Sequence, residues 1–227
     1  MNFVQSALFP ATCLLCGAPG SGGLDLCPGC LHALPWNSAA CAVCAAPLPQ
    51  PGTCGHCLQH PPPYQATLAP LLYRPPLDWL VQGFKFNQRL PPGRLLGELL
   101  ARHLVEHVVA VPDLIVPVPL HPARLRERGY NQALELARPV ARRFGIPLAS
   151  ERVRRIRATA AQSLLAAEAR RRNVRGAFEL VRPLAARHVA IIDDVIATGS
   201  TVGELARVLR RGGVERIEVW AVARTGT

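Results

Sequence analysis

The chain has 227 residues, 49% of them hydrophobic, and a formal net charge of +11. This length allows one ordinary domain together with a small one, and the composition allows a buried core. No apolar run reaches the roughly 18 residues of a membrane-spanning helix, which excludes a helical membrane protein. The first residues carry no positive charge and precede no small-residue cleavage site, so we expect no secretory leader and a cytoplasmic protein.

The charge is unevenly distributed along the sequence. Residues 1–73 contain no Lys or Arg and a single acidic residue, Asp25, so all 26 basic residues follow them. Of these, 25 are Arg and one is Lys85. Contacts with DNA phosphates require Lys or Arg side chains. If the protein binds nucleic acid, we therefore expect the contact in the second part of the chain and not in residues 1–60.

Four C-x-x-C pairs fill the first quarter of the chain. Each pair can supply two thiolates to one tetrahedral metal, so eight cysteines predict two structural zinc sites. A disulfide framework is the weaker alternative, because it requires an oxidising compartment. A closed site with four cysteine ligands leaves no open position for chemistry, so residues 1–60 read as a structural or adaptor module. The eight predicted ligands are Cys13, Cys16, Cys27, Cys30, Cys41, Cys44, Cys54 and Cys57.

The pairing of these four knuckles is open, because the gaps between them are ten, ten and nine residues. Sequential pairing would give two ribbons in a row, and interleaved pairing would give a cross-brace. We favour sequential pairing because short loops close at lower entropic cost. With four thiolates available for each site, His32, His56 and His60 are expected on the surface.

Three prolines at 61–63 form a stiff linker that separates this module from the rest of the chain. Residues 64–73 then read as a strand, and apolar residues at helical spacing predict helices over 77–88 and 95–108. The apolar run at 114–119 predicts a buried strand stopped by prolines.

Basic residues follow this strand directly. Arg124, Arg126 and Arg128 would therefore meet a polyanion at the carboxyl edge of the sheet; an exposed basic loop is the alternative. A helix is expected over 131–144, where Pro139 should kink it or cut it short. Residues 151–157 alternate like an edge strand, and a helix over 201–212 and a strand over 217–223 complete the chain.

The most informative stretch is 189–203. An apolar strand is expected to end in two solvent-facing carboxylates, Asp193 and Asp194, followed by a Thr/Gly/Ser loop and an amphipathic helix. Carboxylates can accept hydrogen bonds from vicinal sugar hydroxyls or hold Mg²⁺. Loop amides, hydroxyls and a helix N-terminus favour a phosphate. Together they suggest a ribose 5-phosphate site; an ordinary capped strand-to-helix turn is the alternative.

Residues 191–201 resemble the phosphoribosyl-pyrophosphate loop of type I phosphoribosyltransferases, and other segments narrow the resemblance to the ComF/GntX family. The resemblance implies that Asp193 and Asp194 contact the ribose hydroxyls. It also implies that the loop wraps the 5′-phosphate. Many such loops carry a second threonine at the first loop position, so its absence here should cost one phosphate donor. The implied phosphate-binding residues are Ala197, Thr198, Gly199, Ser200 and Thr201.

The same resemblance assigns roles elsewhere in the chain. It places Lys85 close to the ligand and makes the turn at 116–119, with Val118, the pyrophosphate loop. The run that begins at Arg128 is a mark of the family. A flexible loop over the active site is implied at Thr159, Gln162, Arg170 and Asn173, and a double zinc ribbon is implied at the N-terminus.

We therefore expect an α/β, type I phosphoribosyltransferase-like fold over 64–227, with a mostly parallel sheet of five or six strands, after a small double zinc ribbon over 1–60. The implied activity is phosphoribosyl transfer from phosphoribosyl pyrophosphate with Mg²⁺, serving DNA uptake in natural competence or the use of external DNA. The acceptor is not indicated by the sequence.

Two other functions are open. One is a non-catalytic factor that binds single-stranded DNA through its Arg-rich second domain, with phosphoribosyl pyrophosphate as ligand or signal. The small number of aromatic residues offers few stacking platforms for bases, which weakens this reading. The other is a regulatory factor that docks other competence proteins through the zinc module.

Overall fold

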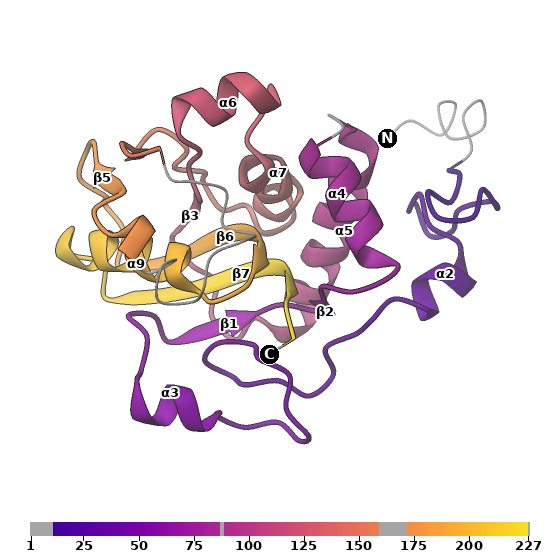
Figure 1. The fold of residues 1–227 in the computed structure, drawn as a ribbon, viewed down its shortest axis with the longest axis horizontal. Coiled ribbons are helices and arrows are strands. Elements are labelled where there is room, and N and C mark those ends of the chain that lie inside the picture. The colour runs from indigo at the N-terminus through magenta and orange to yellow at the C-terminus, as the bar shows by residue number, and fades with distance from the viewer. Residues whose placement is uncertain (1–10, 87–88, 159–171, 227) are drawn as a thin grey trace.

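The computed structural model describes residues 11–86, 89–158 and 172–226 (Figure 1). Helices and strands alternate after two small cysteine-rich ribbons, as expected for an α/β protein. In chain order the elements are α2 (Pro28–His32), α3 (Gly55–Gln59), β1 (Ala66–Leu68), β2 (Leu71–Leu72), α4 (Leu77–Phe86), α5 (Leu90–His107), β3 (Leu114–Pro117), α6 (Pro122–Arg128), α7 (Gln132–Phe144), β4 (Val153–Arg155), β5 (Phe178–Leu180), β6 (His188–Ile196), α9 (Ser200–Arg211) and β7 (Arg216–Arg224).

The central sheet contains five strands, and every pairing within it is parallel. Its order is β1-β7-β6-β3, and β2 pairs with β7 beyond the end of β1. Strands β4 and β5 form a separate antiparallel pair. The expectation of a mostly parallel sheet is confirmed. Parallel strands place all their carboxyl ends at one edge, where ligands bind in folds of this class.

Helices cover both faces of the sheet, which gives three layers (Figure 1). On one face α4, α5 and α7 pack against buried strand residues such as Ile192 and Trp220. On the other face α9 and the β4–β5 pair pack against Val189, Ile191 and Val219. The strands are apolar on both sides because both faces are buried, as is usual in parallel sheets.

The strand expected over 64–73 is interrupted. Ala69 and Pro70 separate β1 from β2. Proline has no amide hydrogen to give to a neighbouring strand, so the ladder cannot run through it. The carbonyl of Pro70 instead accepts from the amide of Asn37, at 2.8 Å.

Two prolines in the helices had effects that the sequence did not predict. Helix α5 begins at Leu90 and not near residue 95, because Pro91 stands in its first turn, where no amide donor is required. Helix α7 continues through Pro139 to Phe144, so of the two expected effects, a kink or a shortened helix, the shortened helix is wrong. Gly97 of α5 makes room for this proline: a Cβ at that glycine would lie 2.6 Å from Cγ of Pro139.

Each ribbon contributes to one of the two hydrophobic cores on either side of the sheet. Cys13 and Leu24 from the first ribbon pack with α4, α5 and α7. Ala45 and Val43 from the second ribbon pack with the α9 face. The ribbons therefore share their buried surface with the sheet domain, while the division into residues 1–60 and 64–227 stays a prediction.

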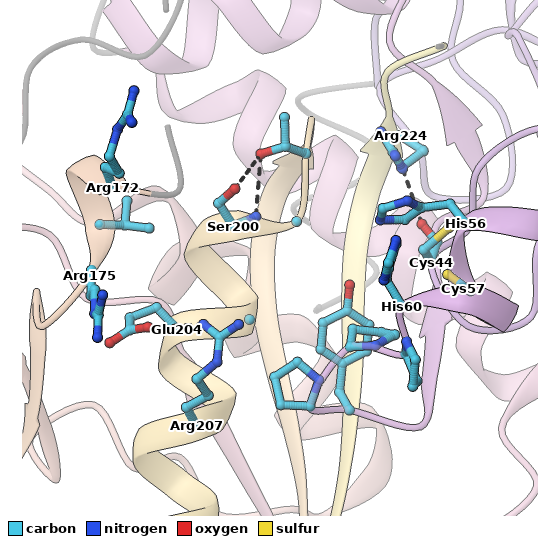
Figure 2. Close-up of a pocket in the computed structure, with 18 of the residues that line it drawn as sticks. Cys44, His56, Cys57, His60, Arg172, Arg175, Ser200, Glu204, Arg207 and Arg224 are labelled. Atoms are coloured by element: carbon cyan, nitrogen blue, oxygen red, sulfur yellow. Dashed lines mark hydrogen bonds and ion pairs between the residues drawn. The ribbon is translucent and has the colours of Figure 1, made fainter. Parts of the chain in front are cut away.

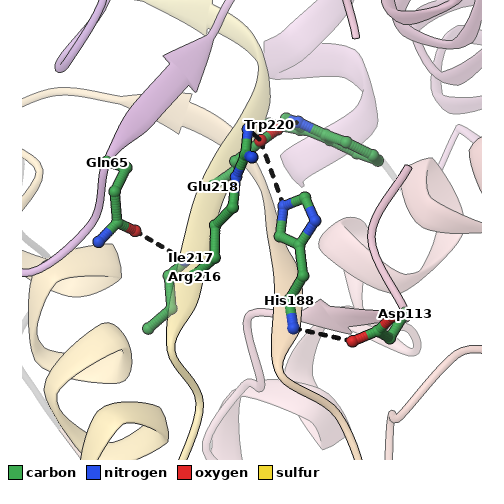
Figure 3. Close-up of polar contacts among 7 residues, drawn as sticks. All are labelled: Gln65, Asp113, His188, Arg216, Ile217, Glu218 and Trp220. Carbon is green, nitrogen blue, oxygen red and sulfur yellow. Dashed lines mark hydrogen bonds and ion pairs between the residues drawn. The ribbon is translucent and has the colours of Figure 1, made fainter. Parts of the chain in front are cut away.

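A polar cluster around the buried Glu218 lies at the amino end of β6 and β7 (Figure 3). Glu218 accepts hydrogen bonds from His188, Arg216 and Trp220, at 3.2, 2.8 and 3.2 Å. Asp113 accepts from the amide of His188 at 2.8 Å, and such backbone hydrogen bonds lower the pKa of its carboxyl. These contacts satisfy buried polar groups at the edge opposite the carboxyl ends of the strands.

Within the described ranges, no helix combines the length and the apolar character needed to cross a membrane.

Candidate functional site

The eight cysteines gather into two groups of four. Cys13, Cys16, Cys27 and Cys30 form one group, and Cys41, Cys44, Cys54 and Cys57 form the other. Within each group the four sulfurs lie within 4.8 Å of one another. The sequential pairing favoured from loop lengths is confirmed.

The spacing of the sulfurs fits tetrahedral zinc. Cys16 and Cys27 approach to 3.6 Å between sulfurs, and Cys44 and Cys54 approach to 3.8 Å. Zn–S bonds of about 2.3 Å in a tetrahedron place sulfurs roughly 3.8 Å apart. His32, His56 and His60 lie exposed, outside both groups. The two groups therefore form the structural zinc sites of a double zinc ribbon.

The electrostatics of the first group also favour a metal. Burial raises the pKa of the Cys13 thiol, but amides of Cys27, Cys16 and Leu15 outweigh it and lower the value to about 6. The neighbouring thiols raise the pKa of Cys30 to about 12. Four thiols this close resist full ionisation unless a cation neutralises them, and Zn²⁺ supplies that charge.

The two aspartates of the candidate site lie within β6 and not beyond its end, since the strand continues to Ile196. Asp194 is only 9% exposed, so the expectation that both carboxylates face solvent is wrong for this residue. Its Oδ1 atom lies 3.0 Å from Nζ of Lys85, in the last turn of α4. The predicted ligand-side lysine is thus brought to the predicted carboxylates, and it neutralises one of them.

Asp193 is partly exposed, but its surroundings disfavour the ionised form of its carboxyl group. Burial and the adjacent Asp194 carboxylate raise the pKa of Asp193 to about 7, against the opposing effects of Lys85 and Arg155. A carboxyl group whose proton is weakly held near neutral pH can exchange that proton for a cation or for a hydroxyl donor. Raised carboxyl pKa values of this kind are frequent at functional sites.

Arg155 on β4 belongs to this site, although the sequence analysis gave it no role. Burial lowers the pKa of its guanidinium, the charge of Asp193 raises it, and Arg124 and Arg128 lower it again. Three arginines therefore lie within electrostatic range of one another beside the aspartates. The alternation of arginines over 151–157 was the sequence feature that could have pointed to Arg155. A strand pattern alone does not show which face of the strand lies toward the site.

The phosphate-loop candidate is a tight turn that leads into α9. Gly199 has a φ of 72°, and a Cβ there would lie 3.0 Å from the hydroxyl oxygen of Tyr64, so glycine is required. The amide of Ser200 donates to Oγ1 of Thr198 at 3.3 Å, and the two hydroxyl oxygens lie 2.7 Å apart. With Ala197 and Thr201 on either side, this turn places hydroxyls beside the amides of a helix N-terminus.

The residues after α6 connect the parts of the site. Tyr130 donates from its hydroxyl to the carbonyl of Phe84, next to Lys85. Asn131 donates to the carbonyl of Val118 at 3.1 Å. Arg128 donates to Gln132 at 3.2 Å. This run thus holds the end of α4 and the turn after β3 in place.

Val118, predicted in the pyrophosphate loop, is 4% exposed. Its amide donates to the carbonyl of Ile192 at 2.9 Å, and its carbonyl accepts from Asn131. Both backbone groups are thus engaged within the protein. Of the predicted flexible-loop residues, Thr159, Gln162 and Arg170 lie outside the described residues, while Asn173 is partly exposed.

A cavity of about 650 Å³ lies beside the phosphate-loop candidate, between the second ribbon and α9 (Figure 2). We call it the arginine-lined cavity. The turn at 198–200 forms one part of its wall, and Glu204 is its acidic lining residue. Its basic lining residues come from four segments: His56, His60, Arg172, Arg175, Arg207, Arg211 and Arg224. This charge favours an anionic ligand.

Comparisons with known proteins agree with both parts of the structure. Residues 4–58 match the double zinc ribbon domain, and residues 131–227 match the phosphoribosyl transferase domain. Among solved structures, a purine phosphoribosyltransferase from Pyrococcus horikoshii aligns with a TM-score of 0.33 and 17% identity, over 70% of this chain and 76% of that one.

Curated relatives match nearly the whole length. DNA utilization protein YhgH of Salmonella typhimurium is 38% identical over 95% of this chain and 98% of its own. Competence protein F of Haemophilus influenzae is 37% identical over 88% of this chain and 90% of its own. Identity at this level over both domains shows common descent. The chain therefore belongs to the ComF/GntX family, whose members join a double zinc ribbon to a phosphoribosyltransferase-like domain.

Proposed function

We propose that this protein binds phosphoribosyl pyrophosphate with Mg²⁺ at the carboxyl edge of β6 and transfers its phosphoribosyl group. The proposal also places this activity in DNA uptake or in the use of external DNA, as the names of the relatives suggest. One observation carries the binding proposal: Asp193, Asp194 and Lys85 meet at the edge where the Thr198–Ser200 turn opens α9.

Each part of the ligand has a matching group. The 5′-phosphate would accept from the amides and hydroxyls of Thr198, Ser200 and Thr201 at the start of α9. The ribose hydroxyls would donate to the carboxylate of Asp193. The diphosphate, which carries most of the negative charge, would lie toward Lys85 and Arg128, with Arg155 behind them.

This arrangement also suits transfer chemistry. When the C1–O bond to the diphosphate breaks, both electrons leave on the diphosphate, and a lone pair of the acceptor forms the new bond to C1. Positive charge then grows on the ribose ring, where the carboxylate of Asp193 would stabilise it. Negative charge grows on the departing diphosphate, where cations would stabilise it.

The donor set fits Mg²⁺ at Asp193 better than at Asp194. Mg²⁺ prefers carboxylate and phosphate oxygens together with waters, and Asp193 is the more exposed of the two residues. Lys85 already occupies the cation position at Asp194. When bound, Mg²⁺ would add positive charge next to the diphosphate oxygens.

Calorimetric titration tests the binding proposal. Phosphoribosyl pyrophosphate should bind in the presence of Mg²⁺, ribose 5-phosphate and pyrophosphate should each bind more weakly, and each should compete with the full ligand. Thr198→Val, which removes a loop hydroxyl, should weaken ribose 5-phosphate and leave pyrophosphate unchanged. Absence of binding by the full ligand would refute the proposal. Pyrophosphate release with a panel of nucleobases and amines would then report turnover.

The arginine-lined cavity favours a second candidate function, the binding of single-stranded DNA. Its four exposed arginines come from two segments: Arg172 and Arg175 lie before β5, and Arg207 and Arg211 lie in the second half of α9. A groove of this charge can follow a phosphate backbone without reading its sequence. In this second function phosphoribosyl pyrophosphate is a ligand or signal. Affinity for single-stranded DNA that falls steeply with salt would support the DNA-binding function.

A further inference from the structure

We propose that the second zinc site holds the phosphate loop in its binding shape through Arg224, so that loss of this one zinc disables the loop. The first zinc site has no such role. This inference rests on the proposed function for its ligand, but its structural part concerns the protein alone.

Arg224 joins the two regions directly. It ends β7 and is 7% exposed. Its Nε atom donates to the carbonyl of Cys44 at 3.1 Å, within the second cysteine group. Its Nη1 atom reaches the carbonyls of Ile196, at 3.1 Å, and Ala197. One guanidinium therefore bridges a metal-binding knuckle and the first residue of the phosphate loop, as the neighbouring positions of Arg224 and Cys44 in Figure 2 illustrate.

The charge of Arg224 makes this bridge depend on the metal. Within the described residues its hydrogen-bond partners are the main-chain carbonyls above and Thr225, all of them uncharged. Four thiolates around one Zn²⁺ carry a net negative charge, which compensates a buried guanidinium next to them. Without the metal, the knuckle loses both its fixed shape and this compensating charge.

Other contacts make the second ribbon part of the wall behind the loop. Thr67 on β1 donates from its hydroxyl to the carbonyl of Val43 at 2.7 Å. The hydroxyl of Tyr64 lies against Gly199, 3.0 Å from where a Cβ of that residue would stand. A knuckle that unfolds would therefore withdraw support from the loop at two points, at the carbonyl of Ala197 and at Gly199.

The first ribbon docks elsewhere and provides an internal control. Arg102 of α5 donates to the carbonyl of Gly22, and Arg94 of α5 lies 3.8 Å from Asp25. In Figure 1 this ribbon lies beside α4 and α5, while the second ribbon lies along β1, β2 and the C-terminal end. The contacts of the first ribbon therefore lie on the face of the sheet opposite α9.

The experiment compares Cys54→Ala, which removes a ligand of the second site, with Cys16→Ala, which removes one of the first. Zinc content is measured first, then hydrogen exchange of the full-length protein without ligand, and then affinity for phosphoribosyl pyrophosphate with Mg²⁺. Cys54→Ala should accelerate exchange at residues 196–203 at least tenfold and weaken binding at least tenfold. Cys16→Ala should do neither.

A second pair of variants keeps the metal and removes the link. Arg224→Gln should retain about two zincs per chain and reproduce the faster exchange at 196–203. Arg102→Gln, which removes the corresponding arginine contact to the first ribbon, should not. If Arg224→Gln does not fold, the comparison of Cys54→Ala with Cys16→Ala tests the inference alone. The zinc content of each variant then shows which site was lost.

Equal loop exchange in Cys54→Ala and Cys16→Ala, with the second site empty in the former, would overturn the inference. A wild-type protein that binds no phosphoribosyl pyrophosphate would instead refute the proposed function. In that case the exchange measurements would still decide whether zinc and loop are coupled.

Discussion

Lys85 and Asp194 form an ion pair across the carboxyl edge of the sheet, with 3.0 Å between Nζ and Oδ1. Their side chains are 22% and 13% exposed, so both charges are largely removed from water. The pair ties the last turn of α4 to β6. Tyr130 stabilises this position, because its hydroxyl donates to the carbonyl of Phe84, one residue before the lysine.

Lys85→Met should destabilise the fold, because it leaves the Asp194 carboxylate without its counter-charge. We expect a loss of roughly 1–3 kcal/mol in unfolding free energy, between the values for exposed and for buried ion pairs. Urea denaturation measures it. The double variant Lys85→Met with Asp194→Asn should recover part of the loss, since the uncompensated charge is gone. Additive losses in the double variant would show that the two residues do not interact.

Asp193 should make stability depend on pH in an unusual direction. Burial and Asp194 raise the pKa of Asp193 from 3.8 to about 7, so the folded protein holds a proton that the unfolded chain releases. The unfolding free energy should therefore fall as pH rises from about 4 to about 7, relative to Asp193→Asn. Urea denaturation of both proteins between pH 5 and pH 8 measures this. Parallel pH profiles would contradict the raised pKa.

The zinc sites were predictable from the sequence. C-x-x-C spacing is a local property, and loop length was enough to favour the sequential pairing that the structure shows. The phosphate-loop candidate was also local, since Asp193 to Thr201 are contiguous. The pairing of Lys85 with Asp194 and the bridge made by Arg224 are contacts between distant segments, which residue patterns do not specify.

The remaining errors have the same origin. Pro139 should end an isolated helix, but α7 is held by packing against α5, where Gly97 accommodates the proline ring. Arg155 reads as one of several strand arginines until the fold places it near Asp193. In the first case packing outweighed the helix-breaking tendency of proline. In the second case the strand pattern could not show which residues lie next to Arg155.

Two zinc ions per chain are expected, because each cysteine group has the geometry of a closed site. Metal analysis of protein purified under reducing conditions without chelators measures the number. A strong chelator should also expose apolar residues of both ribbons, since Cys13 and Ala45 belong to the shared cores. Protein without zinc that keeps its full stability would contradict this expectation.

Single-stranded DNA, if bound, should follow the arginine-lined cavity. Arg207→Gln with Arg211→Gln should lower affinity and should reduce the salt dependence by about 0.7 for each lost phosphate contact. Arg138→Gln with Arg142→Gln removes the same charge from α7, on the other face of the sheet, and should have little effect. Binding isotherms at several salt concentrations measure both pairs. Equal losses would indicate a response to net charge and not to a site.

The central claim is that the carboxyl edge of β6 binds phosphoribosyl pyrophosphate, and Asp193→Asn tests it most directly. This substitution keeps size and polarity and leaves the Lys85–Asp194 pair in place. Glu215→Gln is the matched control, because it removes one charge from an exposed ion pair with Arg187 at the far edge.

The measurement is calorimetric titration with phosphoribosyl pyrophosphate and Mg²⁺ at pH 8, where the Asp193 carboxyl is ionised. Charge-assisted hydrogen bonds contribute about 1.5–3 kcal/mol, so Asp193→Asn should lose at least about tenfold in affinity while Glu215→Gln binds like wild type. Equal affinity of wild type and Asp193→Asn, with matched thermal melts, would contradict the claim.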